Sequence, residues 1–568
     1  MRLPDLLATR FGRLTAFFFL YVTEGVPLGF AATAVATQLR RQDVGPAEIG
    51  ACVGAFYLPW AFKWAFGPFV DVFASDRFGR RRGWIVGTQI MLIVTLLSCM
   101  LLDLPAQLGL LTGVLLIHNS FAAMQDVAID ALAVNTLRED ERGLANGVMF
   151  AGAAIGTAVG GSGVLFLMPL IGLTGGFAFV AACIALVTVF IALPLREPPT
   201  PPEERRGAGL EAAGAAVKGF AVEAFRSFVG TRGAFAGLAF ALLPAGAMSL
   251  GLALQSNLAV EIGMSDGSIA WLSLWSQVIS AASMVVGGWL SDRLGRRRTL
   301  FVYLALMSLP VLYLMAVLIE HQWIMPVGAG KRVAPLALVT AMWIATLTYS
   351  VAQGLMYGTR TALYMDVTNP RVAATQFTAY MAMMNLAIAY SATWQGISIE
   401  ALGYPKTLLI DAVLGLLGLA VLPLIRPVDP RQPVGDGGAA ARTRGLAMLL
   451  AAGCLAWLPY RLGWWSAGAA APIFETVFTL VFVAAAVFLA AGSAVLGASA
   501  RRLGRAGLVL APLLLAMYAR KWWPQAEALY LAVPLLAAVV LAAQARLPWR
   551  PLASRPQAAP GPAPLTSP

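Results

Sequence analysis

Long apolar runs, separated by short polar breaks or by glycine and proline, fill most of the chain. A helix needs about 20 apolar residues to cross a bilayer, so each run of this length predicts a transmembrane helix. Six runs precede a polar stretch that begins at Arg196, and they lie near residues 14–38, 48–70, 84–102, 107–134, 143–168 and 174–195. Six more follow that stretch, near residues 233–258, 268–290, 299–319, 335–365, 373–400 and 407–425. The pattern predicts an all-α polytopic membrane protein with six plus six transmembrane helices.

Further helices are predicted outside these two blocks. About four extra transmembrane helices are expected near residues 445–460, 472–497, 506–519 and 527–545. The polar stretch between the blocks predicts an amphipathic helix lying on a membrane face, with its apolar side formed by Val217, Phe220, Ala224 and Phe228. The predicted divisions are a six-helix bundle at 1–196, a cytoplasmic linker at 197–229, a second six-helix bundle at 230–426, a cytoplasmic loop at 427–443, extra transmembrane helices at 444–546 and a disordered tail at 547–568.

Composition agrees with a membrane protein and excludes a soluble fold. Of the 568 residues, 59% are hydrophobic and 12% are charged, against about 25% charged in an ordinary soluble domain. The net charge of +12 does not predict nucleic-acid binding, because the basic residues gather in short loops between apolar runs. Most of these loops fall on one side, which the positive-inside rule makes cytoplasmic, and both termini lie there. Arg40 and Arg41 are exceptions on the outer side.

The residue types that support catalysis or metal binding are sparse. The chain has two histidines and four cysteines, and the cysteines all lie inside apolar runs, where they are expected to act as small core residues. No catalytic constellation and no metal site is therefore predicted, and an enzyme is not expected.

One loop sequence occurs twice, at matching places in the two blocks. The copy between the second and third helices contains Gly67, Asp71, Asp76, Arg77, Gly79 and Arg80. The copy between the eighth and ninth helices contains Gly288, Asp292, Arg293, Gly295 and Arg296. The first glycine of each copy allows close helix approach, and the aspartate can pair with the basic loop or cap a helix, so both copies predict a cytoplasmic gate. An insertion leaves Asp71 or Asp76 as the pairing acid of the first copy, and the spacing from Gly67 favours Asp71.

This repeated Asp-Arg-x-Gly-Arg pattern resembles the cytoplasmic loop signature of the major facilitator superfamily. That resemblance implies two six-helix bundles related by an axis along the membrane normal. Four other stretches resemble the peptide/acetyl-coenzyme A transporter group, which includes AmpG-like muropeptide permeases. They are YVTEGVPLG from Tyr21, LPWAFKWAFGP from Leu58, QDVAIDA from Gln125 and ATQF from Ala374. The four extra helices exceed the two that this resemblance implies.

The resemblance also implies a function. It implies proton-driven import of anhydro-muropeptides by alternating access, across the bacterial inner membrane, with no cofactor besides the proton gradient. Related members carry acetyl-coenzyme A or iron-siderophores, which remain alternative substrates. The expected partners are a small-molecule substrate and the lipid bilayer, and the chain is expected to act as a monomer. A membrane-bound transferase and a non-transporting receptor are the alternatives from other classes.

Ionisable residues inside a membrane are costly and usually mark a substrate or ion path. In the first block, Glu24 lies in the first helix and Lys63 in the second. They can pair with each other, Lys63 can extend toward the cytoplasmic face, or a static salt bridge can form.

The fourth helix carries a polar stripe of Gln125, Asp126 and Asp130. The two aspartates share a helix face and suit a proton carrier, because each carboxylate disfavours ionisation of the other. Alternatively, they pair with Arg138 or Arg142 near the cytoplasmic end. His118 is either a hydrogen-bonding residue of the pathway or an ordinary core residue.

In the second block, the tenth helix carries the polar residues Gln353, Arg360, Tyr364 and Asp366. Arg360 is a single cation inside an apolar run and could bind a carboxylate or phosphate of the substrate through two hydrogen bonds. An internal pair with Asp366 is the alternative. We therefore predict a substrate and proton pathway lined by Glu24, Lys63, His118, Gln125, Asp126, Asp130, Gln353, Arg360 and Tyr364.

Overall fold

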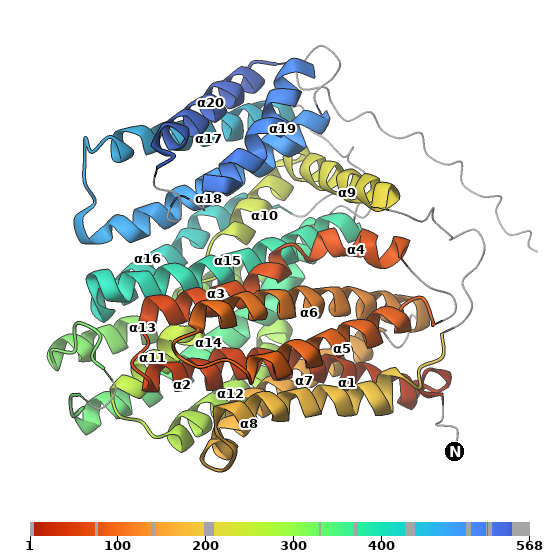
Figure 1. Cartoon of the computed structure of the whole chain (residues 1–568), viewed down its shortest axis with the longest axis vertical. Coiled ribbons are helices and arrows are strands. Elements are labelled where there is room, and N and C mark those ends of the chain that lie inside the picture. Colours follow the sequence, from red (N-terminus) through yellow and green to blue (C-terminus); the bar gives the residue numbers. More distant parts are fainter. Residues whose placement is uncertain are drawn as a thin grey trace, which may run out of the picture.

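The computed structural model describes residues 5–73, 78–137, 142–197, 210–328, 331–368, 373–426, 438–495, 501–517, 520 and 525–547. Within these ranges the regular elements are helices, most of which lie roughly parallel or antiparallel (Figure 1). Eleven of the described helical segments are long and apolar enough to cross a membrane. The all-α polytopic class predicted from the apolar runs is therefore confirmed.

The first half of the molecule contains six helical spans, four of which are interrupted or extended. Helix α1 (Arg10–Gly29) continues through a π-helical segment (Phe30–Val35) into α2 (Ala36–Arg41). The remaining elements are α3 (Pro46–Ala61), α4 (Lys63–Val72), α5 (Arg82–Cys99), α6 (Leu108–Thr136), α7 (Arg142–Ala158), a π-helical segment (Val159–Gly163), α8 (Val164–Val187) and a last π-helical segment (Thr188–Ala192). Gly172 has a φ of 63°, which bends α8 sharply and divides the fifth span from the sixth.

The second half contains α10 (Arg232–Leu242), α11 (Ala253–Glu261), α12 (Asp266–Leu294), α13 (Arg296–Glu320), α14 (Leu336–Val367), α15 (Ala373–Leu402) and α16 (Tyr404–Val421). The sequence predicts one continuous seventh span near residues 233–258, and this expectation is wrong, because the span is broken between α10 and α11. The backbone N–H groups of Met248 and Ser249 donate to the buried carboxylate of Asp411, each at 2.9 Å. Gln395 donates to the same carboxylate at 2.8 Å. The first two bonds satisfy two of the backbone N–H groups that the broken helix leaves free.

Helix α9 (Leu210–Gly230) precedes the second half, and four accessory helices follow it. They are α17 (Ala439–Arg461), α18 (Ala471–Val495), α19 (Arg501–Ala516) and α20 (Glu527–Ala545). A separate apolar cluster fills the space between the accessory helices, and the indole of Trp457 donates to the carbonyl of Tyr530 at 2.9 Å. In Figure 1 these blue helices lie at one side of the molecule, beside α9 and α15.

Close packing of α1 against α7 depends on glycines. A methyl group added at Gly156 would lie 2.5 Å from the carbonyl oxygen of Val22, and one added at Gly160 would collide with the backbone of Val26. Gly25 and Gly29 leave the matching space on α1. Small residues therefore form the surface of α7 and of the following π-helical segment against which α1 packs.

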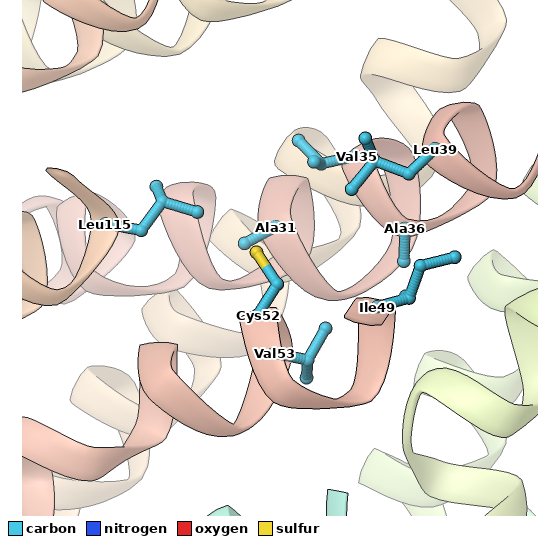
Figure 2. Close-up of a pocket in the computed structure, with 8 residues that line it drawn as sticks. All are labelled: Ala31, Val35, Ala36, Leu39, Ile49, Cys52, Val53 and Leu115. Carbon is cyan, nitrogen blue, oxygen red and sulfur yellow. The ribbon is translucent and has the colours of Figure 1, made fainter. Parts of the chain in front are cut away.

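A small apolar pocket lies where the extension of α1 meets α3 and α6 (Figure 2). Its lining includes Ala31, Leu39, Cys52 and Leu115, and its volume of about 10 Å³ is close to that of one water molecule. A pocket of this size and character is a packing void and does not bind a solute.

The packing of α1 against α7 leads to a first prediction. Gly156→Ala should lower the melting temperature in detergent, since the added methyl group forces the helices apart at a cost of about 1–3 kcal/mol. The matched control is Gly147→Ala on the same helix, where an added methyl group meets nothing within 4 Å. This control should be neutral or stabilising, because alanine favours a helix over glycine by about 1 kcal/mol. Equal melting temperatures for the two variants would contradict the packing described above.

Candidate functional site

Two helices of the first half bring a lysine to two carboxylates. Lys63 begins α4, directly after the bend that follows α3, and its ammonium group contacts Asp126 on α6. The same Nζ atom lies 3.2 Å from Oδ2 of Asp130, one helical turn further along α6. Because one ammonium group bridges both aspartates, these three residues form a single ionic cluster.

Further polar side chains of α1 surround this cluster. The Tyr21 hydroxyl donates to Oδ1 of Asp130 at 2.6 Å, and the amide of Gln125 donates to the Thr23 hydroxyl at 2.8 Å. Glu24 lies close enough to Asp126, Asp130 and Lys63 to interact with them electrostatically. One of its oxygens is buried with no hydrogen-bond partner among the described residues.

These contacts resolve the alternatives that the sequence left open for Lys63. Its ammonium group is engaged by Asp126 and Asp130 rather than extended to the membrane face. Glu24 adjoins the cluster, but the ion pairs of Lys63 are formed with Asp126 and Asp130. Arg138 lies outside the described residues and the side chain of Arg142 is not described, so the alternative partners of the aspartates are untested.

His118 lies apart from the ionic cluster, although it shares α6 with both aspartates. Its Nδ1 is 2.8 Å from the Thr95 hydroxyl of α5, and its ring lies beside that of Phe56 on α3. These neighbours place His118 in the packing between α3, α5 and α6. Its assignment to the pathway has no support from these contacts, which favour an ordinary core residue.

The second half holds a buried cation. Arg360 on α14 is 2% exposed, and two of its guanidinium nitrogens, Nε and Nη2, have no hydrogen-bond partner among the described residues. The guanidinium lies 5.8 Å from the ring centres of both Phe240 and Tyr364. Asp366, the alternative partner, instead accepts from Arg296 at 2.5 Å. Gln353 lies on the same helix, with its amide 3.5 Å from the Tyr349 hydroxyl.

One glycine of the repeated loop has nearly the same φ angle in both halves. Gly79 and Gly295 have φ angles of 89° and 91°, a region that glycine favours. Arg82 donates to the carbonyl of Leu195 at 2.9 Å, and Arg297 donates to that of Ile425 at 3.0 Å. An arginine of each loop therefore fastens it to the end of the last helix of its own half. We call the face that carries these two loops the arginine-loop face.

Other parts of the motif are placed as follows. Asp292 pairs with Arg296 at 3.3 Å, and Arg293 covers the ring of Trp289 at 4.1 Å. Asp76 and Arg77 lie outside the described residues, and Asp71 lies in α4 with its side chain undescribed. The choice between Asp71 and Asp76 therefore stays a prediction.

The role expected of the first glycine in each copy is wrong. Methyl groups added at Gly67 and Gly288 would meet nothing within 4 Å, whereas one at the neighbouring Gly287 would collide with the backbone of Leu355 on α14. Close approach therefore occurs one residue earlier in the second copy, because the face of α12 that meets α14 is set by packing over the whole helix.

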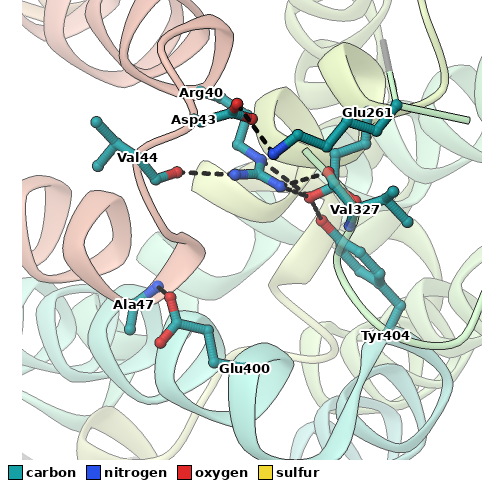
Figure 3. A network of polar contacts seen from close by, with 9 residues as sticks. Arg40, Asp43, Val44, Ala47, Glu261, Val327, Glu400 and Tyr404 are labelled. Carbon is teal, nitrogen blue, oxygen red and sulfur yellow. Dashed lines mark hydrogen bonds and ion pairs between the residues drawn. The ribbon is translucent and has the colours of Figure 1, made fainter. Parts of the chain in front are cut away.

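On the face opposite the arginine loops, ionic contacts join the two halves (Figure 3). The guanidinium of Arg40 donates to Glu261 at 2.5 and 2.9 Å, and Tyr404 donates to the same carboxylate oxygen at 2.6 Å. The backbone N–H of Val327 donates to the other oxygen at 2.9 Å. Both partners of the Arg40–Glu261 pair are buried, with side-chain exposures of 4% and 0%.

More exposed contacts flank this pair. Arg41 pairs with Asp266 at 2.6 Å, Lys331 lies 3.3 Å from Asp43, and Glu400 accepts from the backbone N–H of Ala47 at 2.9 Å. We call these contacts, together with Arg40, Glu261 and Tyr404, the inter-half network. Sequence reasoning missed it, although two basic residues on the outer side were a signal, because positive charge there needs a local partner.

A comparison of the sequence with models of known protein families identifies the family of this chain. A sequence model described as Major Facilitator Superfamily matches residues 14–250 and 236–554. The chain belongs to the major facilitator superfamily. Its members' two-bundle architecture is also seen in solved structures that this chain resembles, namely a D-xylose–proton symporter (TM-score 0.55, 12% identity, 73% of this chain and 97% of that one) and a POT family transporter in complex with 5-aminolevulinic acid (TM-score 0.54, 11% identity, 72% and 95%). At such identities these structures show the fold alone.

Relatives in sequence are transporters as well. The anhydromuropeptide permease of Escherichia coli K12 is 24% identical over 425 residues, which cover 73% of this chain and 79% of that protein. A probable folate-biopterin transporter 6 of Arabidopsis thaliana is 30% identical over 184 residues, which cover 31% and 36%. Family membership shows that this facilitator is a transporter and not an enzyme.

The Arg40–Glu261 pair is more deeply buried than the Arg41–Asp266 pair, and this difference leads to a second prediction. Arg40→Ala should destabilise the protein by about 3–5 kcal/mol, because it leaves Glu261 buried without its cation. Arg41→Ala, the matched control from a more exposed pair, should cost at most about 1 kcal/mol. Thermal unfolding of both variants in one detergent measures the difference. If Arg41→Ala proves as damaging as Arg40→Ala, burial does not distinguish the two pairs.

Proposed function

We propose that this facilitator imports an anionic solute, an anhydro-muropeptide, across the bacterial inner membrane in symport with protons. The observation that carries the proposal is the distribution of buried charge. The first half holds three carboxyl groups around one lysine, whereas the second half holds an arginine with unsatisfied donors. Each arrangement is incomplete, and each suits a different ligand.

The carboxyl cluster is suited to taking up a proton. If Glu24, Asp126 and Asp130 were all ionised, one ammonium group would leave two negative charges uncompensated at low dielectric, which is strongly unfavourable. Binding of a proton relieves this repulsion. The cluster can thus load and release a proton as its surroundings change between the two faces of the membrane.

Arg360 is suited to binding an anion. A guanidinium group presents paired donors that match a carboxylate, and burial strengthens such a bond by excluding water. The free carboxylates on the peptide part of a muropeptide are groups of this kind. The name of the E. coli relative supports this choice of substrate.

Alternating access explains why the inter-half network lies opposite the arginine loops. A facilitator exposes its central site to one side at a time, and contacts between the halves close the other side. We assign the arginine-loop face to the cytoplasm by the positive-inside rule, with both termini there. The inter-half network then closes the outer side.

Uptake into proteoliposomes tests the choice of substrate. With an inward proton gradient, labelled anhydro-muropeptide should accumulate, whereas acetyl-coenzyme A and an iron-siderophore should not. Accumulation of either of the latter compounds alone would transfer the proposal to that substrate, and accumulation of none would contradict transport of this class of solute.

The third prediction concerns proton coupling. Combined Glu24→Gln, Asp126→Asn and Asp130→Asn substitutions should abolish accumulation driven by a pH gradient but leave counterflow exchange, which needs no net proton movement. Glu48→Gln, which changes an exposed carboxylate on α3, is the control and should behave as the native protein. A triple variant that still concentrates the substrate under an imposed pH gradient would exclude these acids as proton carriers.

The fourth prediction concerns the anion. Arg360→Lys should raise the apparent KM about tenfold or more and change Vmax less, because a charged hydrogen bond is worth about 1.5–3 kcal/mol and lysine cannot form two parallel bonds. Arg298→Lys on the exposed start of α13 is the control. An unchanged KM for Arg360→Lys would rule out Arg360 as the anion site.

A further inference from the structure

A column of aromatic rings extends from Arg360 to the linker helix α9. The Tyr364 ring stacks on the Tyr380 ring of α15 with centroids 4.9 Å apart and planes at 27°. Tyr380 also packs against Phe228 of α9 in an edge-on arrangement, with the two ring centroids 4.9 Å apart. Arg360, 5.8 Å from the centre of the Tyr364 ring, lies at the inner end. We call Phe228, Tyr380 and Tyr364 the aromatic column.

The rings of this column have little freedom to move separately. Tyr364 and Tyr380 are fully buried, and Phe228 is 6% exposed. The Tyr380 hydroxyl donates to the carbonyl of Ala234 at 3.1 Å, and its ring lies so close to Gly237 of α10 that an added methyl group would be 3.1 Å away. In a close-packed interior, a shift of one ring therefore displaces the next.

The outer end of the column is held by the accessory helices. Arg442 of α17 donates to the carbonyls of Val229 and Gly230, the last residues of α9, at 2.8 and 2.7 Å. Phe225 of α9 packs edge-on against Phe488 of α18, with the ring centroids 5.6 Å apart. These contacts flank Phe228 in sequence, so the accessory helices determine where its ring lies.

The sequence predicted that this linker forms an amphipathic helix lying on a membrane face. In the structure, Ala224 and Phe228 of its apolar side are buried, and Phe228 packs against α15. An amphipathic linker helix that packs against the protein can transmit force between the parts that it contacts. Helix α9 contacts α4 of the first half, α15 of the second half, and both α17 and α18.

We propose that the aromatic column positions the guanidinium of Arg360 for the substrate anion, and that the accessory helices set this position through α9. This inference rests on the proposed function, in which Arg360 binds the anion. Two donor nitrogens of Arg360 lack acceptors among the described residues, so the rings beside it contribute strongly to its orientation. Phe228 and Tyr380 are positioning residues, since they act on the substrate through Arg360.

The inference is tested by kinetics of labelled anhydro-muropeptide uptake in proteoliposomes. Phe228→Ala should raise the apparent KM about threefold to tenfold with Vmax within twofold, and Phe228→Tyr should restore the native KM. Arg442→Ala, which removes the bonds that hold α9, should raise KM about twofold to fivefold. Arg444→Ala, two residues away and exposed, is its matched control and should leave KM unchanged.

A double variant shows whether the effect passes through Arg360. In the Arg360→Lys background, Phe228→Ala should raise KM no further, because the group that the column positions is already altered. Full additivity of the two effects would overturn the inference, as would a Phe228→Ala protein that loses Vmax at native KM. If Phe228→Ala does not fold, the comparison of Arg442→Ala with Arg444→Ala decides, and equal KM values for these two variants overturn the inference.

The same assay separates this inference from the proposed function. An unchanged KM for Arg360→Lys would contradict the proposed function and the inference together. A raised KM for Arg360→Lys, with native KM values for Phe228→Ala and Arg442→Ala, would contradict the inference alone.

Discussion

The cost of burying charge inside a bilayer is the constraint on which this structure depends. Each ionisable group at membrane depth needs an opposite charge or a set of hydrogen bonds within the protein. Asp411 obtains its donors from a broken helix, Asp126 and Asp130 share Lys63, and Glu261 receives a guanidinium, a phenol and a backbone N–H. Because the partners come from different helices, each such group also determines which helices lie together.

The contacts that stabilise these buried charges are of two kinds: some lie within one half of the molecule, and others join the two halves. The Lys63 cluster, the Asp411 contacts and the Arg296–Asp366 pair each lie within one half, so they can persist while the halves rotate against each other. The inter-half network joins the halves, and in the transport cycle that we propose it separates when the outer side opens. Water that enters then can hydrate Arg40 and Glu261, which lowers the free-energy cost of separating this buried pair. Rigid halves with a separable contact between them are what alternating access requires.

The accessory helices add a third body to the two halves. Their own apolar cluster makes them a compact unit, and Arg442 and Phe488 attach that unit to α9. Since α9 also contacts both halves, the accessory helices lie beside the segment that connects the two halves. The aromatic rings between α9 and Arg360 give this attachment a continuous physical path to a buried cation.

Hydropathy alone indicated most of the helices, because an apolar run long enough to cross a bilayer has few other stable conformations, but it did not indicate the break in the seventh span. The repeated loop was evident from the sequence as well, whereas the left-handed conformation of Gly79 and Gly295 came from the structure. The residues that carry charge were also evident, since Glu24, Lys63, Asp126 and Arg360 interrupt apolar runs. Only the tertiary structure decided their partners. Asp366 contacts Arg296 rather than Arg360, His118 contacts Thr95 rather than the carboxylates, and Arg40 meets Glu261 across more than two hundred residues of sequence. Such pairings depend on which helices are adjacent and how each is rotated about its axis, and long-range packing sets both.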